Sequence, residues 1–130
     1  MHREGEMFRL LTIILVISFA PASFAQKAKT IKQEDTFIDM IVGKKWTHAW
    51  GKTWVKVNKD GTVIGDSPNG KIKGTWYWKQ SAFSDKRWCR TVTVGSKEFK
   101  EECQKFQTIG DRIMVNTTSS APKGNYYFTK

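Results

Sequence analysis

Residues 46–78 read WTHAWGKTWVKVNKDGTVIGDSPNGKIKGTWYW, in which short alternating segments are separated by turn signals. The turn signals are Trp50-Gly51-Lys52-Thr53, Asn58-Lys59-Asp60-Gly61 and Ser67-Pro68-Asn69-Gly70. Each carries glycine or proline at a position that a tight turn favours. Short strands at this spacing are typical of an antiparallel sandwich or barrel.

These turns also predict the direction of each side chain. A two-residue hairpin at Gly51 and Lys52 places Trp46 opposite Val57, and the later turns place Val57 opposite Val63. The inward face then consists of Trp46, His48, Trp50, Val55, Val57, Val63, Ile72, Gly74, Trp76 and Trp78. The outward face is mostly polar and includes Trp54, Lys56, Lys71, Lys73, Tyr77 and Lys79. One apolar and one polar face indicate a half-buried antiparallel sheet.

The second half of the chain predicts a disulfide-linked hairpin. A strand over 88–94 and a partner over 98–107, joined by a loop at 95–97, place Cys89 directly opposite Cys103. In the chain-entropy model this disulfide contributes ~3 kcal/mol. Both faces of the hairpin mix apolar and polar residues, so either a bulge intervenes or part of the outer face is covered. Two further strands, 112–116 and 125–129, bring the total to about eight.

The start of the chain indicates export. An apolar run over Leu10–Ala20, followed by Pro21 and the small-residue site Ser23-Phe24-Ala25, predicts a secretory signal peptide over 1–25 with cleavage after Ala25. Translation starts at Met1 or Met7. We expect a periplasmic or secreted protein that does not span the membrane, with a flexible arm over 26–35 and a barrel domain over 36–130.

Composition argues against catalysis and against specific nucleic-acid binding. The formal net charge is +10, and after residue 25 the only arginines are Arg87, Arg90 and Arg112. Bidentate recognition of bases and phosphates favours arginine over lysine. His48 is the only histidine after residue 25, and both cysteines are assigned to the disulfide, so no metal cluster or cofactor is expected. No hydrolase, zinc-protease or nucleotide-binding motif occurs, and we expect a non-enzymatic monomer.

The segment before the strands predicts a short helix. Phe37, Met40 and Ile41 have i, i+3, i+4 spacing, and Gly43 is placed to end the helix. A short helix followed by Gly43-Lys44-Lys45-Trp46 and about eight up-and-down strands resembles the calycin barrels. That resemblance implies that the ring of Trp46 closes one end of the barrel.

A more specific resemblance rests on five short motifs: DGTVIG (60–65), GTWYW (74–78), WCR (88–90), ECQ (102–104) and GD (110–111). Together they are similar to a group of small exported proteobacterial proteins described as lipocalin-like. The resemblance covers most of residues 43–111 and implies an all-β, calycin-like barrel in an exported protein. It implies no catalytic residue.

Two functions from different classes fit these residues. In the first, a Trp-lined interior holds a small apolar or aromatic ligand, with His48 as its polar contact and Trp50, Trp76 and Trp78 around it. In the second, Trp54, Tyr77 and the outward lysines bind an acidic envelope polysaccharide or lipopolysaccharide. The second reading has a five-stranded oligonucleotide-binding barrel as its fold alternative. A third hypothesis is a protein partner at Trp54 and Ile64. The rings can also be core packing alone.

Overall fold

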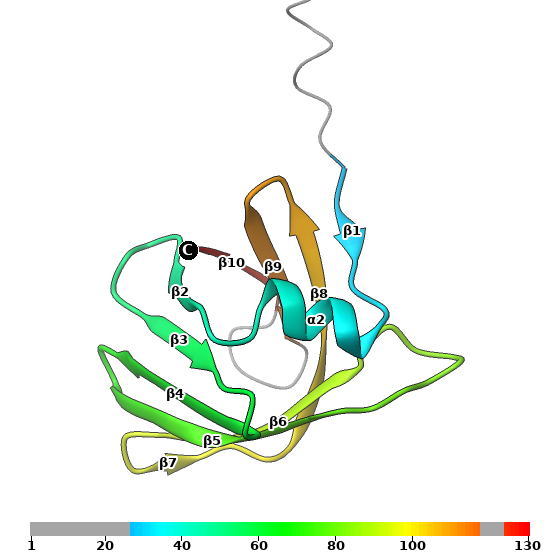
Figure 1. Ribbon diagram of the computed structural model, residues 1–130. Helices are drawn as coiled ribbons and strands as arrows, with labels where there is room; N and C mark the ends of the chain where they lie inside the picture. Colours follow the sequence, from blue (N-terminus) through cyan, green and yellow to red (C-terminus); the bar gives the residue numbers. More distant parts are fainter. Residues whose placement is uncertain (1–26, 118–123) are drawn as a thin grey trace, which may run out of the picture.

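The computed structural model describes residues 27–117 and 124–130 (Figure 1). In chain order the elements are β1 (Lys29–Thr30), α2 (Glu34–Met40), β2 (Lys45–His48), β3 (Trp54–Val57), β4 (Thr62–Ser67), β5 (Gly70–Trp78), β6 (Trp88–Val94), β7 (Lys97–Glu98), β8 (Glu102–Ile109), β9 (Arg112–Thr117) and β10 (Gly124–Thr129). The predicted signal peptide, with its cleavage site after Ala25, lies outside the described residues.

Eight of the described strands close into an antiparallel barrel. Strands β2 to β6 pair in chain order, β6 pairs with β8, and β8, β9 and β10 lead back to β2. Strand β7 extends the free end of β6, and β1 pairs with β8. Because each barrel strand lies beside the next along the chain, the topology is up-and-down. The predicted small all-β, calycin-like barrel with a short N-terminal helix is confirmed.

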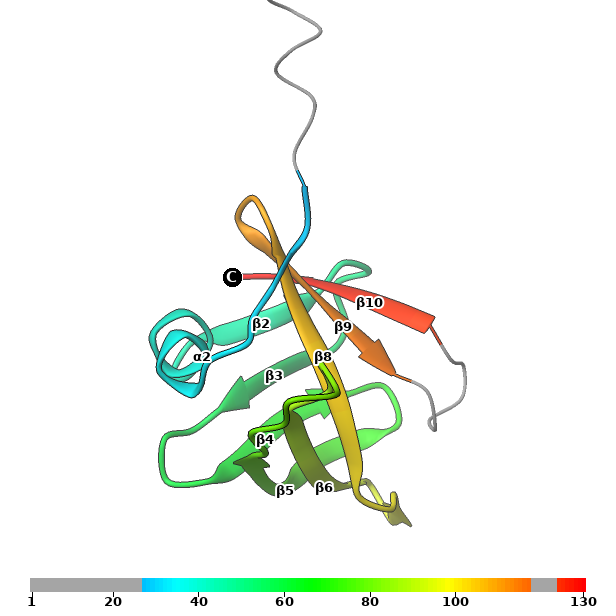
Figure 2. The ribbon, with the colours of Figure 1, turned by 90° about the vertical axis from the view of Figure 1, so that its right-hand side faces the viewer.

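Helix α2 lies at one end of the barrel, on the left in Figure 2. Phe37 and Ile41, four residues apart on one face, are fully buried against the strands. Glu34 and Asp35 occupy the first turn, where negative charge stabilises a helix. Gly43 follows with a φ of +83°, a conformation that glycine adopts readily. The helix starts three residues before Phe37, the first apolar residue of the predicted spacing, and it covers this end of the barrel.

The segment before α2 pairs with strand β8. Lys29 and Thr30 pair with β8, and the backbone N–H of Ile31 donates to the carbonyl of Phe106 at 2.9 Å. The Ile31 side chain is buried in the core. Within the segment 26–35, for which a flexible arm was predicted, residues 29–31 thus contact the barrel through the edge of β8 and one apolar side chain.

The predicted register holds across three strands and shifts at one turn. Val57 lies opposite Val63, and Val63 lies opposite Gly74, as predicted. In the first hairpin, however, Trp46 lies opposite Val55 rather than Val57. The loop is longer than two residues, since the His48 N–H donates to the Thr53 carbonyl. A shift of two residues leaves each strand residue on its predicted face.

A bulge separates β7 from β8. Thr93 lies opposite Glu98, but Cys89 lies opposite Cys103, so the strand after the turn contains one extra residue. The bulge reverses the direction of Phe99, which lies on the interior side. The outer face is also partly covered, because Cys89 is fully buried. Both explanations offered for the mixed hairpin faces therefore apply.

Candidate ligand cavity inside the barrel

A cavity of about 280 Å³ occupies the barrel interior. Its walls are formed mainly by apolar side chains of the strands, among them Val55, Val57, Val63, Ile72, Val92 and Val94. Trp46, Trp88 and Phe106 line it as well, and all three rings are buried. The indole N–H of Trp46 donates to the carbonyl of Ile41 at 3.1 Å. This bond ties the inward ring to the end of the helix, where the calycin resemblance placed it.

The end of the barrel beside α2 is filled by aromatic rings. The Phe37 ring lies 5.5 Å from Trp76, 5.3 Å from Trp78, 6.2 Å from Trp88 and 5.0 Å from Phe106, measured between centroids. These distances are typical of attractive aromatic pairs. We call these five residues the aromatic plug. Trp76 and Trp78 thus face inward as predicted, but they pack against the helix rather than against the cavity.

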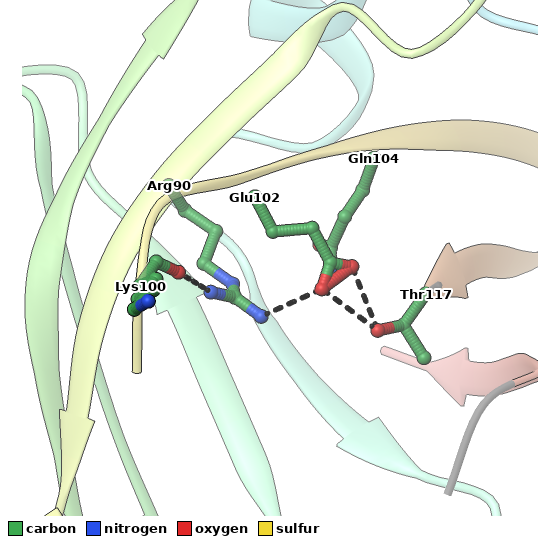
Figure 3. A network of polar contacts seen from close by, with 5 residues as sticks. All are labelled: Arg90, Lys100, Glu102, Gln104 and Thr117. Atoms are coloured by element: carbon green, nitrogen blue, oxygen red, sulfur yellow. Dashed lines mark hydrogen bonds and ion pairs between the residues drawn. The ribbon is translucent and has the colours of Figure 1, made fainter. Parts of the chain in front are cut away.

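A cluster of polar side chains is joined by hydrogen bonds and an ion pair (Figure 3), and three of its members line the cavity. A guanidinium nitrogen of Arg90 lies 3.2 Å from a Glu102 oxygen, and both side chains are more than nine-tenths buried. The Thr117 hydroxyl donates to the same carboxylate at 2.7 Å, and the Gln104 amide donates to it at 3.2 Å. Arg90 also donates to the carbonyl of Lys100 at 3.0 Å. Arg90, Gln104 and Thr117 line the cavity.

Burial and charge both act on this cluster. Burial lowers the pKa of Arg90, while the neighbouring Glu102 carboxylate opposes that change. Burial also raises the pKa of Tyr126, which lines the cavity, and the negative charge of Glu102 raises it further. The ion pair places one positive and one negative charge side by side. Within the described residues, the charges of the polar wall therefore balance, with the negative member near Tyr126.

None of the predicted site residues belongs to this cluster, although the sequence contains a signal for it. The register that pairs Cys89 with Cys103 also pairs Arg90 with Glu102. Arg90 and Val92 are two residues apart on one strand and so share a face. Arg90 and Val92 belong to the hairpin whose two faces each mix apolar and polar residues. The inward face of that hairpin was therefore not identified, and no inward charge was predicted.

Three of the four predicted ligand residues occupy the interior side, and one does not. His48 is half-buried, and its ring lies 5.6 Å from Tyr126 and 5.3 Å from Phe128. Trp50 is 87% exposed at the tip of the β2–β3 loop, where its backbone N–H donates to Nδ1 of His48. The prediction that Trp50 faces the interior is wrong, because the loop is longer than a two-residue hairpin. None of His48, Trp50, Trp76 and Trp78 is among the described residues that line the cavity.

The predicted surface residues lie on the outer faces of β3 and β5. The ammonium group of Lys45 lies 4.7 Å above the ring of Trp54, and Lys45 is directly opposite Lys56. Ile64 of β4 lies between Lys56 and Lys73, which are on the strands to either side of it. Lys71 lies opposite Asp66. Tyr77 is exposed, and a hydrogen bond to Glu101 at 3.1 Å raises its pKa. Lys79 is exposed just beyond β5.

The predicted disulfide is present. Cys89 and Cys103 are bonded, with a Cα–Cα distance of 3.9 Å, and they join β6 to β8 directly behind the Arg90–Glu102 pair. The disulfide faces outward, because Cys89 also lies opposite the outward Tyr77. It therefore fastens the strand pair that carries the polar wall.

Comparisons with protein-family models, curated proteins and solved structures found no match to this chain. Within residues 27–117 and 124–130, no helix has the length and apolar character needed to cross a membrane.

Proposed function

We propose that this chain is a non-enzymatic binding protein of lipocalin-like type that holds a small apolar or aromatic ligand inside the barrel. The observation that carries the proposal is the apolar cavity with a buried polar cluster on one wall. Ligand sites are commonly concave and apolar, with a few polar groups that orient the ligand. A buried ion pair contributes little net stability, because the cost of desolvating its charges offsets their attraction. Stability alone therefore does not explain this cluster.

The size of the cavity limits the ligand. A cavity of 150 Å³ can hold benzene, so by proportion 280 Å³ accommodates roughly eleven non-hydrogen atoms. A ligand with one or two rings fits this volume, whereas a long acyl chain exceeds it. The proposed ligand is therefore compact.

The place of action is part of the same proposal. The Cys89–Cys103 disulfide is typical of an oxidising compartment, which supports a periplasmic or secreted protein. The helix-capped, up-and-down barrel supports membership of the small exported lipocalin-like group.

A cavity-filling substitution tests the binding function. Val92→Trp adds a ring to the cavity wall, whereas Thr91→Trp adds the same ring to the exposed face of the same strand. Isothermal titration with naphthalene should detect binding to the wild-type chain and to Thr91→Trp, and at least tenfold weaker binding to Val92→Trp. Equal binding to both variants, or none to the wild-type chain, would contradict the proposal. Circular dichroism checks that both variants fold.

A second function, binding of an acidic glycan at the outer face, is favoured by one observation. Lys45 and Lys56 lie directly opposite each other, and Lys73 lies one strand further across Ile64. Like charges in neighbouring positions are destabilising in a sheet. In the described residues none of these lysines has a carboxylate partner within ion-pair distance. We propose this row as the contact for a polyanion.

Column chromatography separates this function from the first. The charge-reversed pair Lys56→Glu with Lys73→Glu should elute from a heparin column at clearly lower salt than the control pair Lys59→Glu with Lys105→Glu. Both pairs change the net charge equally, so a difference reports position. Elution of both at the same salt concentration would mean that only overall charge matters, and the proposed contact would be withdrawn.

A further inference from the structure

Two polar groups of the cavity wall have no hydrogen-bond partner among the described residues. The indole N–H of Trp88 is buried and has no acceptor. The side-chain amide of Gln104 uses its nitrogen to donate to Glu102, and its oxygen accepts no hydrogen bond within the described ranges. Buried polar groups in folded proteins are nearly always paired, so the buried N–H of Trp88 requires an explanation.

The direction of the Gln104 amide follows from its neighbour. A carboxylate can only accept hydrogen bonds, so the amide must turn its nitrogen toward Glu102. The amide oxygen is then directed away from Glu102. Thr117 and Arg90 hold the carboxylate in place, at 2.7 Å and 3.2 Å. The cluster therefore fixes a hydrogen-bond acceptor at the cavity wall.

The two unpaired groups are neighbours. Trp88 and Gln104 lie directly opposite each other on β6 and β8, and both line the cavity. Side chains at directly opposite positions have Cβ atoms about 5 Å apart. Two neighbouring side chains of the cavity wall thus carry one donor and one acceptor that have no partner among the described residues.

The charges nearby select against ions. The positive charge of Arg90 is already matched by Glu102 at 3.2 Å. An anionic group beside Gln104 would face that carboxylate, and a cationic group would add an uncompensated charge in a buried site. Of the ligand classes that hydrogen-bond to both Trp88 and Gln104, an uncharged group costs least to bury.

We propose that the Trp88–Gln104 pair recognises an uncharged group that both accepts and donates a hydrogen bond, such as a hydroxyl or a carboxamide, on a compact apolar ligand. This inference rests on the proposed cavity function and specifies its ligand class. The ligand oxygen accepts from the Trp88 indole, and its O–H or N–H donates to the Gln104 oxygen. The apolar body of the ligand lies against the valine and isoleucine walls.

Four probes test the ligand class: naphthalene, 2-naphthol, benzamide and benzoate, titrated calorimetrically at neutral pH. Two added hydrogen bonds should make 2-naphthol bind about tenfold more tightly than naphthalene. We expect benzoate to bind more than tenfold more weakly than benzamide, which is uncharged and equal in size. If benzoate binds as tightly as benzamide, or if naphthalene and 2-naphthol bind equally, the inference is overturned while the cavity function stands. If none of the four binds, both fall.

Two conservative variants test the residues. Trp88→Phe keeps a ring beside Phe106 but removes the N–H, and Gln104→Leu removes the acceptor. Each should weaken 2-naphthol about five- to tenfold and leave naphthalene within about twofold. The control Ile72→Val changes an apolar part of the wall and should affect both probes alike. An equal loss for both probes in Trp88→Phe and Gln104→Leu would overturn the assignment.

Discussion

The two ends of the barrel interior are built differently. Beside α2, Phe37 packs against the rings of Trp76, Trp78, Trp88 and Phe106. Beyond this aromatic plug, smaller side chains leave a cavity of about 280 Å³ with an ion pair in its wall. The large rings contribute most of the packing, so the rest of the interior can stay open without loss of the fold. Trp88 and Phe106 belong to both the plug and the cavity wall, so the packed part of the interior adjoins the open part directly.

Removing the centre of the plug should have the largest effect. Phe37→Ala leaves a hole at a site with no exposed surface, and we expect a loss of ~3–5 kcal/mol in the free energy of unfolding. Ile72→Ala removes a side chain that already faces the cavity, and its cost should lie near ~2 kcal/mol. Urea unfolding of both variants measures the difference. Equal losses would contradict the division between a packed and an open part.

Breaking the buried ion pair should cost nearly as much as emptying the plug. Arg90→Met removes the guanidinium that lies 3.2 Å from the buried Glu102 carboxylate, for which a loss of ~3–5 kcal/mol is expected. The double variant Arg90→Met with Glu102→Leu should recover most of it, because both charges of the pair are then removed together. Denaturant unfolding of the single and double variants checks this. A double variant no more stable than the single one would contradict the account of the polar wall.

The disulfide lies on the outer side of the strand pair that carries both Trp88 and Arg90. Cys89 lies between Trp88 of the plug and Arg90 of the polar wall. Replacement of both cysteines by alanine should lower the free energy of unfolding by ~3 kcal/mol. Chemical denaturation of the oxidised wild-type chain and the double variant measures it. A loss of under ~1 kcal/mol would contradict the expectation that the disulfide stabilises the fold by restricting the conformations of the unfolded chain.

We expect the smallest effect at Trp50 in the β2–β3 loop, whose side chain was predicted to face the barrel interior. Trp50 is exposed, so Trp50→Ala should change the free energy of unfolding by no more than ~0.5 kcal/mol. Trp46→Ala, four residues earlier and buried, provides the contrast with a loss of ~3–5 kcal/mol. Thermal and urea unfolding of both variants measure this, and similar losses would place Trp50 in the core after all.

The sequence predicted registers well where turns are short and their residues unambiguous. Val57, Val63 and Gly74 were placed opposite their partners because the turns at 58–61 and 67–70 leave few alternatives. The length of the β2–β3 loop was predicted wrongly. Gly51 also suits a longer loop, in which His48 accepts a hydrogen bond from the Trp50 backbone.

The Cys89–Cys103 pairing was predicted for a partly incorrect reason. The turn is one residue shorter than expected, and the bulge before Glu102 adds one residue back. The two differences cancel at the cysteines, but they reverse Phe99. Periodicity alone cannot locate a bulge, so the inward Phe99 and the Arg90–Glu102 pair required the structure.

Methyl NMR of the labelled chain during titration with 2-naphthol tests the central claim most directly. Ligand in the cavity should shift the methyl signals of Ile72, Val92 and Val94, which line it, in a saturable manner. The signals of Ile64, exposed on the outer face, should stay unchanged. Shifts confined to Ile64 and its surroundings, or no saturable shift at the cavity methyls, would contradict a ligand site inside this barrel.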